Sequence, residues 1–267
     1  MPFTISHAAA ILPFARNLNR WRVLSAAVIG SMVPDFGLLL PWGASRLQTH
    51  SMLSLLTFCL PVGLLSYWLF EFIVKPTARE VLPDTAYLRS AGFAEADSIA
   101  SVRQWLKASV AILAGAVTHL AWDGFTHEGA RGVRMFPMLY DPVEIGGHPL
   151  LAFQLAQHAS SILGLAVVLY VMWTALSSGE KSIDAPAREL LRAARRAWMG
   201  AYVGTALIFC AMSYVLAERH DQFSKTLSWI IESLAIGGLR GLIFSLLAVS
   251  LLLKIRLWTA AAARNRV

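Results

Sequence analysis

Long runs of apolar residues constrain this chain more than any other feature of its sequence. Five runs reach or approach the length that a helix needs to cross about 30 Å of hydrocarbon, and they occupy residues 51–74, 108–125, 150–176, 197–217 and 229–253. A sixth run, at 23–42, contains Pro34 and Asp35. A proline or a charged residue is costly at membrane depth and is expected there only where it has a structural or functional role. We therefore predict an all-α fold, a single polytopic transmembrane helical bundle with about six membrane helices over residues 1–267.

Composition excludes a soluble or disordered chain. Hydrophobic residues make up 57% and charged residues 15% of the sequence, against about 45–50% and 25% in soluble domains. The positive-inside rule explains the net charge of +7 better than nucleic-acid binding does. With the loops 75–107 and 177–196 and the C-terminus in the cytoplasm, most lysines and arginines lie on the inner side. The two cysteines lie inside apolar runs and predict neither a disulfide framework nor a thiolate metal cluster.

The segment THLAWDGFTHEG carries the strongest local signal for chemistry, because His119, Asp123 and His127 recur every four residues. In a continuous helix such residues form one stripe, since four residues turn about 400° around the axis. Imidazole nitrogens and a carboxylate oxygen are typical zinc ligands. The stripe therefore predicts a divalent metal site, with a polar contact to a neighbouring helix as the alternative.

Other ionisable residues lie toward the same, outer ends of the predicted helices, where they could share one site. Asp35 stands in GSMVPDFG, in which Pro34 can break the helix and aim the carboxylate inward. His50 stands just before the second apolar run, in RLQTHSMLS, and His158 lies about one or two turns deeper. Taken alone, Asp35 could equally be a proton-relay acid, and His50 an interface histidine.

His7 is the exception to this clustering. Six crossings would leave it on the cytoplasmic side of the membrane, away from the other residues. It reaches them only if residues 3–15 form a helix that turns back into the bundle, or if the run at 23–42 does not cross. The sequence leaves both possibilities open.

Four short motifs of the sequence resemble those of a known family, and they are MPFTISHAA, GSMVPDF, QTHS and THLAWDGFTH. Together they resemble a bacterial membrane-protein family known as a domain of unknown function, whose chains begin Met-Pro-Phe-Thr. Their order is similar to that in LexA-regulated inner-membrane metal-dependent hydrolases, and more remotely to that in zinc-dependent phospholipase C and the single-strand-specific zinc nucleases. The remoter enzymes are all-helical and hold three zinc ions. The resemblance covers most of the chain and implies a protein of the bacterial inner (cytoplasmic) membrane.

The resemblance also implies a set of metal ligands. In chain order, the ligands of the remoter enzymes correspond to His7, Asp35, His50, His119, Asp123 and His127. Carried over, Asp123 bridges two metals. One of these would be held by Asp35, His50 and His119, and His7 would help to hold the other.

The end of the chain departs from the family pattern, which closes with His-x-x-x-Glu. Here His148 is followed four residues later by Ala152. Gln154 and His158 also stand four residues apart, but the histidine comes last in this pair and first in the family pattern. We therefore expect one or two divalent ions, with zinc as the expected metal, and we keep His158 as a candidate ligand.

A metal site at the level of the outer headgroups predicts hydrolysis of a membrane component. A bound metal lowers the pKa of water to about 7 and polarises a phosphoryl oxygen. We predict a metal-dependent hydrolase that acts on a phospholipid or a lipid-linked phosphoester, with no nucleic-acid partner. The candidate general bases are Asp35, Asp123 and Glu128, of which Glu128 is favoured because it is not needed as a ligand. The arginines that could clamp a phosphate are Arg46, Arg131 and Arg134.

Three other classes remain open at this stage. Paired histidines could bind haem, although the clustered aspartates argue against it. A transporter could use the same Asp/His cluster as a proton relay, with Glu232 and Arg240 as coupled charges in the last apolar run. The third alternative is a membrane scaffold without catalysis.

Overall fold

The computed structural model describes residues 4–39, 45–81, 101–177, 189–220 and 227–264. The chain forms two compact units. The first comprises Met1–Tyr67 and Ile99–Trp173, and the second comprises Trp68–Ser98 and Thr174–Val267.

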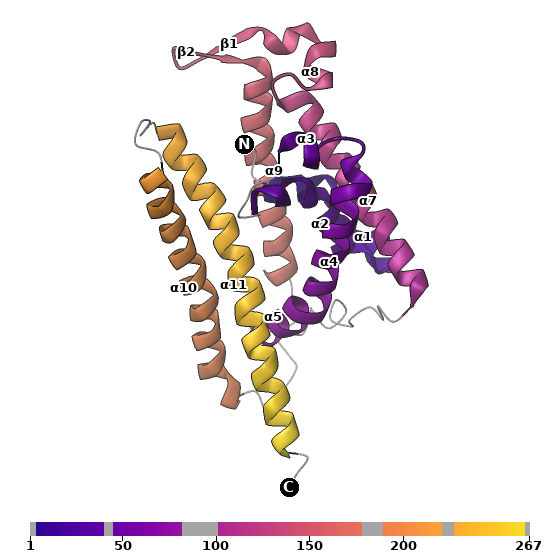
Figure 1. Cartoon of the computed structure of the whole chain (residues 1–267), viewed down its shortest axis with the longest axis vertical. Helices are drawn as coiled ribbons and strands as arrows, with labels where there is room; N and C mark the ends of the chain where they lie inside the picture. The colour runs from indigo at the N-terminus through magenta and orange to yellow at the C-terminus, as the bar shows by residue number, and fades with distance from the viewer. Residues whose placement is uncertain (1–3, 40–44, 82–100, 178–188, 221–226, 265–267) are drawn as a thin grey trace. The chain divides into compact units, whose positions relative to one another are not determined.

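The first unit is mainly helical (Figure 1). Its N-terminal part contains the 3-10 helices η1 (Thr4–Ala10), η2 (Leu12–Phe14) and η3 (Val33–Leu39) and the α-helices α1 (Ala15–Arg20), α2 (Leu24–Met32) and α3 (Arg46–Thr49). A π-helical turn, η4 (Leu55–Cys59), leads into α4 (Leu60–Leu69). The rest comprises α7 (Val102–Thr126), α8 (Arg131–Met135), η7 (Pro137–Tyr140), β1 (Pro142–Ile145), β2 (His148–Leu151) and α9 (Ala152–Ser177).

Two glycines allow α2 and α7 to pack with their backbones in contact (Figure 1). A Cβ atom on Gly30 would collide with the carbonyl oxygen of Ile112, and one on Gly115 would collide with the carbonyl oxygen of Ala27. Ile112 is itself fully buried. This crossing fixes the α7 turn that follows Gly115, and that turn carries the first histidine of the stripe, His119.

A short antiparallel hairpin joins the helical parts of the first unit, as an exception to the all-helical prediction. Strands β1 and β2 pair Pro142 with Leu151 and Ile145 with His148. The two residues of the turn, Gly146 and Gly147, have φ angles of 58° and 81°, as a tight turn of the I′ class requires. The apolar run predicted as a helix over 150–176 therefore becomes helical only at Ala152.

The second unit contains the π-helical turn η5 (Phe70–Val74), α5 (Lys75–Val81) and the long helices α10 (Glu189–His220) and α11 (Leu227–Arg264). Helices α10 and α11 lie side by side (Figure 1). Side-chain hydroxyl groups join them. The Tyr202 hydroxyl is 2.7 Å from Ser250 Oγ, and Thr205 Oγ1 donates to Ser245 Oγ at 2.7 Å. Part of the predicted cytoplasmic loop 75–107 is helical in α5 and at the start of α7, and residues 82–100 lie outside the described residues.

Four helices in the described part of the chain are long and apolar enough to cross a membrane: Leu55–Ala78, Val102–Thr126, Ala152–Thr174 and Ile236–Thr259. They indicate a multi-pass membrane protein. The prediction of six crossings is wrong. The run at 23–42 yields only a short apolar helix, Leu24–Leu39, which tightens into 3-10 geometry just before Pro34. The run at 197–217 lies within α10, which is not among the four, and some of its side chains lie outside the described residues.

Candidate metal centre

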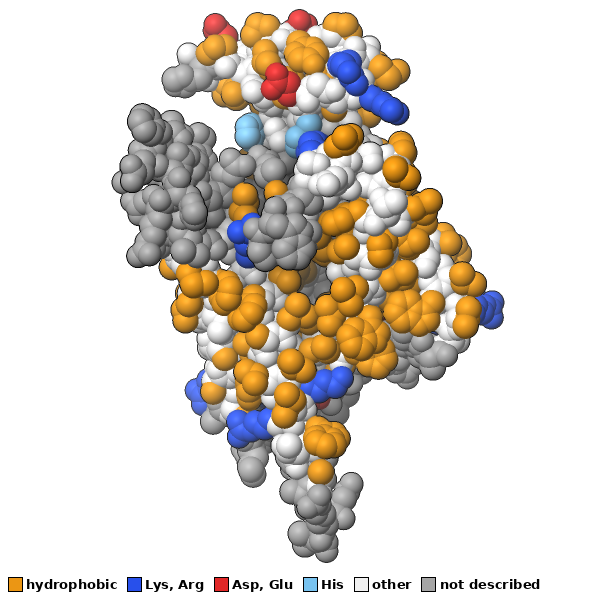
Figure 2. All heavy atoms as spheres, viewed as in Figure 1, with side chains coloured by type: hydrophobic (Ala, Val, Ile, Leu, Met, Phe, Trp, Pro, Cys, Tyr) orange, Lys and Arg blue, Asp and Glu red, His pale blue; other side chains and the backbone are white. Residues whose placement is uncertain are grey.

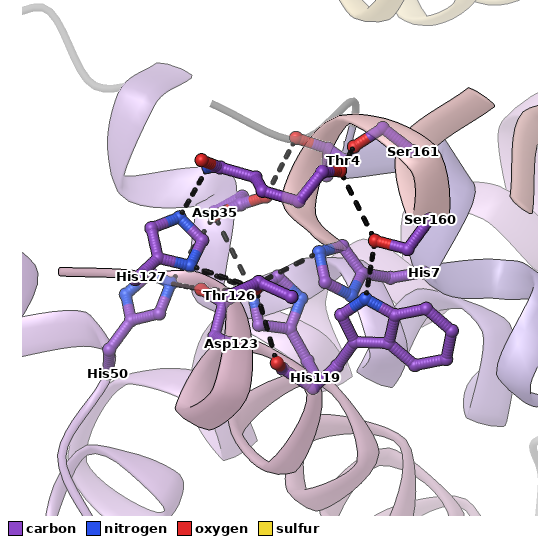
Figure 3. A network of polar contacts seen from close by, with 12 residues as sticks. Thr4, His7, Asp35, His50, His119, Asp123, Thr126, His127, Ser160 and Ser161 are labelled. Atoms are coloured by element: carbon purple, nitrogen blue, oxygen red, sulfur yellow. Dashed lines mark hydrogen bonds and ion pairs between the residues drawn. The ribbon is translucent and has the colours of Figure 1, made fainter. Parts of the chain in front are cut away.

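Six of the predicted ligands meet in one buried cluster within the first unit (Figure 3). They are supplied by η1, η3, α7 and the residues that directly follow α3 and α7, and they are His7, Asp35, His50, His119, Asp123 and His127. The helix α7 contributes His119 and Asp123, because it continues unbroken through Gly124, and His127 follows its last residue, Thr126, in an extended conformation. We refer to these six residues as the His/Asp cluster.

The structure brings His7 into the cluster. Because Leu24–Leu39 is not among the four candidate crossings, the chain need not place His7 and the end of α7 on opposite sides of the membrane. The η1 helix contacts both α2 and α7. The His7 ring stacks on the His119 ring, with 3.8 Å between the ring centroids.

The backbone of α2 fixes the tautomer of His119. His119 Nδ1 is 2.8 Å from the carbonyl oxygen of Ser31, which can only accept a hydrogen bond, so Nδ1 carries the proton. A neutral imidazole then has its lone pair on Nε2, and this atom faces both carboxylates of the cluster. Such a bond to the second ring nitrogen is what normally orients a metal-binding histidine.

Asp35, His50 and His119 form one half of the cluster together with one oxygen of Asp123. Asp35 Oδ1 is 3.3 Å from His50 Nε2 and 3.6 Å from His119 Nε2. The same two nitrogens are 3.5 Å and 3.6 Å from Asp123 Oδ2. The second oxygen of Asp35 accepts a hydrogen bond of 2.9 Å from Thr4 Oγ1, which holds the carboxylate in this orientation.

His7 and His127 face the other oxygen of Asp123. His7 Nε2 is 3.6 Å from Asp123 Oδ1, and His127 Nδ1 is 3.4 Å from it. The far nitrogen of His127, Nε2, lies 3.2 Å from the side-chain nitrogen of Gln157 on α9. The carboxylate of Asp123 thus has imidazoles on both sides (Figure 3).

Several atoms of the cluster are buried without a hydrogen-bond partner among the described residues, namely His7 Nε2, His50 Nε2, His119 Nε2 and Asp123 Oδ1. A buried polar atom without a partner is costly, and a bound ion could satisfy four such atoms that converge on one region. Two groups of residues could hold a metal ion: His7, His119 and Asp123, and Asp35, His50 and His119.

The separations between ligand atoms fit a small divalent ion. A tetrahedral ion with bonds of about 2.0–2.1 Å holds its ligand atoms about 3.3–3.4 Å apart. The cluster's N···O separations of 3.3–3.6 Å are close to this value and longer than ordinary hydrogen bonds. The donor set of imidazole nitrogens and carboxylate oxygens is also the one that zinc prefers.

Burial favours the neutral form of two of the histidines. It lowers the pKa of His7 to about 4, and the neighbouring His119 adds to the effect. Burial likewise lowers the pKa of His127. The one strong cationic contact of the cluster in the described residues comes from Arg46, whose Nη2 lies 2.7 Å from Asp123 Oδ2.

The remaining predicted site residues lie elsewhere. Glu128 is exposed, one residue beyond His127. His158 is exposed on α9, and no described contact joins it to the cluster. Arg131 and Arg134 are exposed on α8, and the side chains of His148 and Glu232 lie outside the described residues.

Three further residues orient the cluster and were not predicted from the sequence: Thr4, Ser31 and Gln157. Ser31 acts through its carbonyl oxygen, which no sequence motif reveals. Gln157 had a weak signal, because Gln157 and Ser161 place polar groups four residues apart on an apolar helix. Trp122 Nε1 donates to Ser160 Oγ at 3.1 Å and so ties this part of α9 to α7.

These features define a multi-pass membrane protein with a buried His/Asp cluster that could bind a metal. A comparison with protein families matches residues 1–251 to the family described as a domain of unknown function, DUF4184. The chain belongs to this family, which confirms the expected membership of a family of unknown function. Comparisons with curated proteins and with solved structures find no match.

Proposed function

We propose that the His/Asp cluster binds two zinc-like divalent ions and that the protein hydrolyses a phosphoester of a membrane lipid. The observation that carries this proposal is the position of Asp123. Its Oδ2 faces His50 and His119, and its Oδ1 faces His7 and His127. A carboxylate with a separate set of imidazoles at each oxygen is suited to bridge two cations.

Each oxygen of Asp123 has a chemically reasonable set of companion ligands. Asp35 Oδ1, His50 Nε2 and His119 Nε2 complete a four-ligand set with Oδ2, which resembles a closed site. His7 Nε2 and His127 Nδ1 give only three ligands with Oδ1. His127 Nδ1 can bind an ion when Nε2 carries the proton and the Gln157 amide presents its oxygen to Nε2. Three protein ligands and an open position are the usual pattern of a catalytic ion.

Bound ions would supply Lewis acidity and a water of lowered pKa. The chain's own residues supply orientation and proton transfer. Asp35 and Asp123 are both needed as ligands in this arrangement, because Asp35 Oδ1 and both oxygens of Asp123 face imidazole nitrogens. Glu128 is exposed next to His127, so we assign it as the general base. The reaction consumes one water, cleaves one P–O bond and releases an alcohol and a phosphate.

The place of the cluster along the chain supports a lipid substrate. His50 comes just before the candidate membrane helix that begins at Leu55, and His127 directly follows the one that ends at Thr126. Gln157 lies in the second turn of the helix that begins at Ala152. If these three helices cross, their cluster ends share one membrane face, at the level of the headgroups.

The geometry favours a metal centre over the transport alternative. A proton relay needs donors and acceptors at hydrogen-bond distance, about 2.7–3.2 Å. The imidazole nitrogens here lie 3.3–3.6 Å from the carboxylate oxygens and converge on shared centres. We therefore retain the hydrolase as the single proposal.

The test uses the full chain, reconstituted with zinc in vesicles that contain phosphatidylglycerol. Phosphorus NMR and lipid mass spectrometry would follow the release of phosphate-bearing products. We expect hydrolysis by the wild type and none by Glu128→Gln or Asp123→Asn, with zinc retained only in Glu128→Gln. Zinc-loaded wild type that leaves every phosphoester intact would contradict the proposed activity, and full activity of Glu128→Gln would contradict the assignment of the base.

A further inference from the structure

Arg46 holds an unusual position between solvent and the buried cluster. It is the first residue of α3, and 46% of its side chain is exposed. Its Nη2 lies 2.7 Å from Oδ2 of Asp123, a side chain that is only 4% exposed. The guanidinium therefore reaches from the surface into the ligand set. Figure 2 shows that histidine side chains come to the surface beside a basic side chain.

The backbone that carries Arg46 is fixed, whereas the side chain is long. Ser45 and Gln48 form a reciprocal cap, in which the Ser45 side chain accepts from the Gln48 amide and the Gln48 side chain accepts from the Ser45 amide at 2.9 Å. Helix α3 also contacts η3 and η4, next to Asp35 and His50. Arg46 can therefore change partners without any movement of the helix.

The oxygen that Arg46 contacts is one that a metal would need. Asp123 Oδ2 is also the atom that faces His50 Nε2 and His119 Nε2. A guanidinium keeps its charge at every accessible pH, and a divalent ion at this oxygen would repel it. A guanidinium that is displaced toward solvent beside bound cations is well placed to pair with a phosphate, which accepts two parallel hydrogen bonds from arginine.

We propose that Arg46 is the anion-binding residue of this site: it pairs with Asp123 before the ions bind and with a phosphate group of the substrate afterwards. The proposal rests on the proposed function and deepens it, because it selects phosphoesters over uncharged carboxylic esters. The shared ligand chemistry is a phosphate that bears a negative charge, whether on a lipid or free in solution.

The test compares wild type with Arg46→Gln and with Arg103→Gln, which removes an exposed arginine from the first turn of α7. Calorimetry on detergent-purified protein would titrate Zn²⁺ into the metal-free form, and then inorganic phosphate or short-chain phosphatidylglycerol into the zinc-loaded form. In Arg46→Gln we expect zinc to bind more tightly and phosphate more weakly, each by about tenfold. Arg103→Gln should match wild type in both.

Each outcome has a distinct meaning. Wild-type phosphate affinity in Arg46→Gln would overturn the role of Arg46 while leaving the metal centre intact. A wild type that binds no zinc would overturn the proposed function and this inference together. Wild-type preference for phosphatidylglycerol over inorganic phosphate would support a headgroup as the source of the anion. The opposite preference would overturn the lipid substrate and retain the anion-binding role.

Discussion

Buried carboxylates have different kinds of partners in the two compact units. In the second unit, Glu71 is 1% exposed and its Oε2 pairs with Lys75 Nζ at 2.7 Å, one turn along the same helix. In the first unit, Asp35 and Asp123 face four imidazoles from several elements at 3.3–3.6 Å. Among the described residues, one oxygen of Glu71 has no hydrogen-bond partner, whereas four converging atoms of the cluster have none. The nearby Lys75 neutralises Glu71, whereas the cluster combines one contact to Arg46 with a group of atoms that could hold a metal ion.

The largest effect is expected from the bridging carboxylate. Asp123→Asn removes the charge that both proposed ions share, so we expect loss of all bound zinc in equilibrium dialysis. Glu71→Gln is the matched control, because it neutralises an equally buried acid in the other unit and should retain wild-type zinc. Loss of zinc from both variants would show that the contrast between the units is unfounded.

A smaller effect should follow from removing a ligand of one ion only. His7 faces Oδ1 of Asp123, and the closest contacts of His50 lie on the Oδ2 side. We expect His7→Ala to bind about half as much zinc as wild type, measured as metal per protein after gel filtration. Full occupancy in this variant would exclude His7 as a ligand, and complete loss would favour a single shared ion.

Removing a hydrogen-bond partner of a metal ligand should weaken zinc binding less than removing the ligand itself. Thr4→Ala removes the hydroxyl that donates to Asp35 Oδ2, and loss of such an orienting bond typically weakens metal binding by about 10–100-fold. Competition with a fluorescent chelator would measure the change. Thr4→Ser keeps the hydroxyl and should remain close to wild type, and equal affinities in Thr4→Ala and wild type would refute the orienting role.

The smallest effect is expected from substitutions that change helix packing, and their effect on stability should differ between the two units. Gly115→Ala places a methyl group against the α2 backbone, and overpacking of this kind costs about 1–3 kcal/mol of unfolding free energy. Gly204→Ala in α10 meets no atom within 4 Å and should gain slightly, because alanine favours the helix. Thermal melting in detergent would compare them, and a stabilised Gly115→Ala would contradict the close crossing.

Much of the cluster could be predicted from sequence because helical geometry is local. The four-residue spacing of His119 and Asp123 places them on one stripe of α7, whereas His127, predicted on the same stripe, reaches the cluster as the extended residue after the helix. Ionisable residues are costly inside a membrane and need polar partners there. Asp35 and His50 were therefore predicted to lie near them, at the same membrane depth. The structure brings these five together, although the number and identity of the ions remain predictions.

The rest depends on how the chain packs, which sequence patterns do not contain. The place of His7 depended on whether 23–42 crosses, and that segment is too short and too bent once α2 gives way to η3. The carbonyl oxygen of Ser31 reaches His119 only because Gly30 and Gly115 bring two backbones together. Hydropathy alone also assigned residues 150 and 151 to a membrane helix, although they belong to a hairpin strand.

Metal content tests the central claim most directly. Wild-type protein, purified in detergent without chelators and dialysed against zinc, would be analysed by inductively coupled plasma mass spectrometry alongside Asp123→Asn and Glu71→Gln. The account predicts two equivalents of zinc in wild type and Glu71→Gln and none in Asp123→Asn. Wild type that binds no metal under these conditions would contradict it.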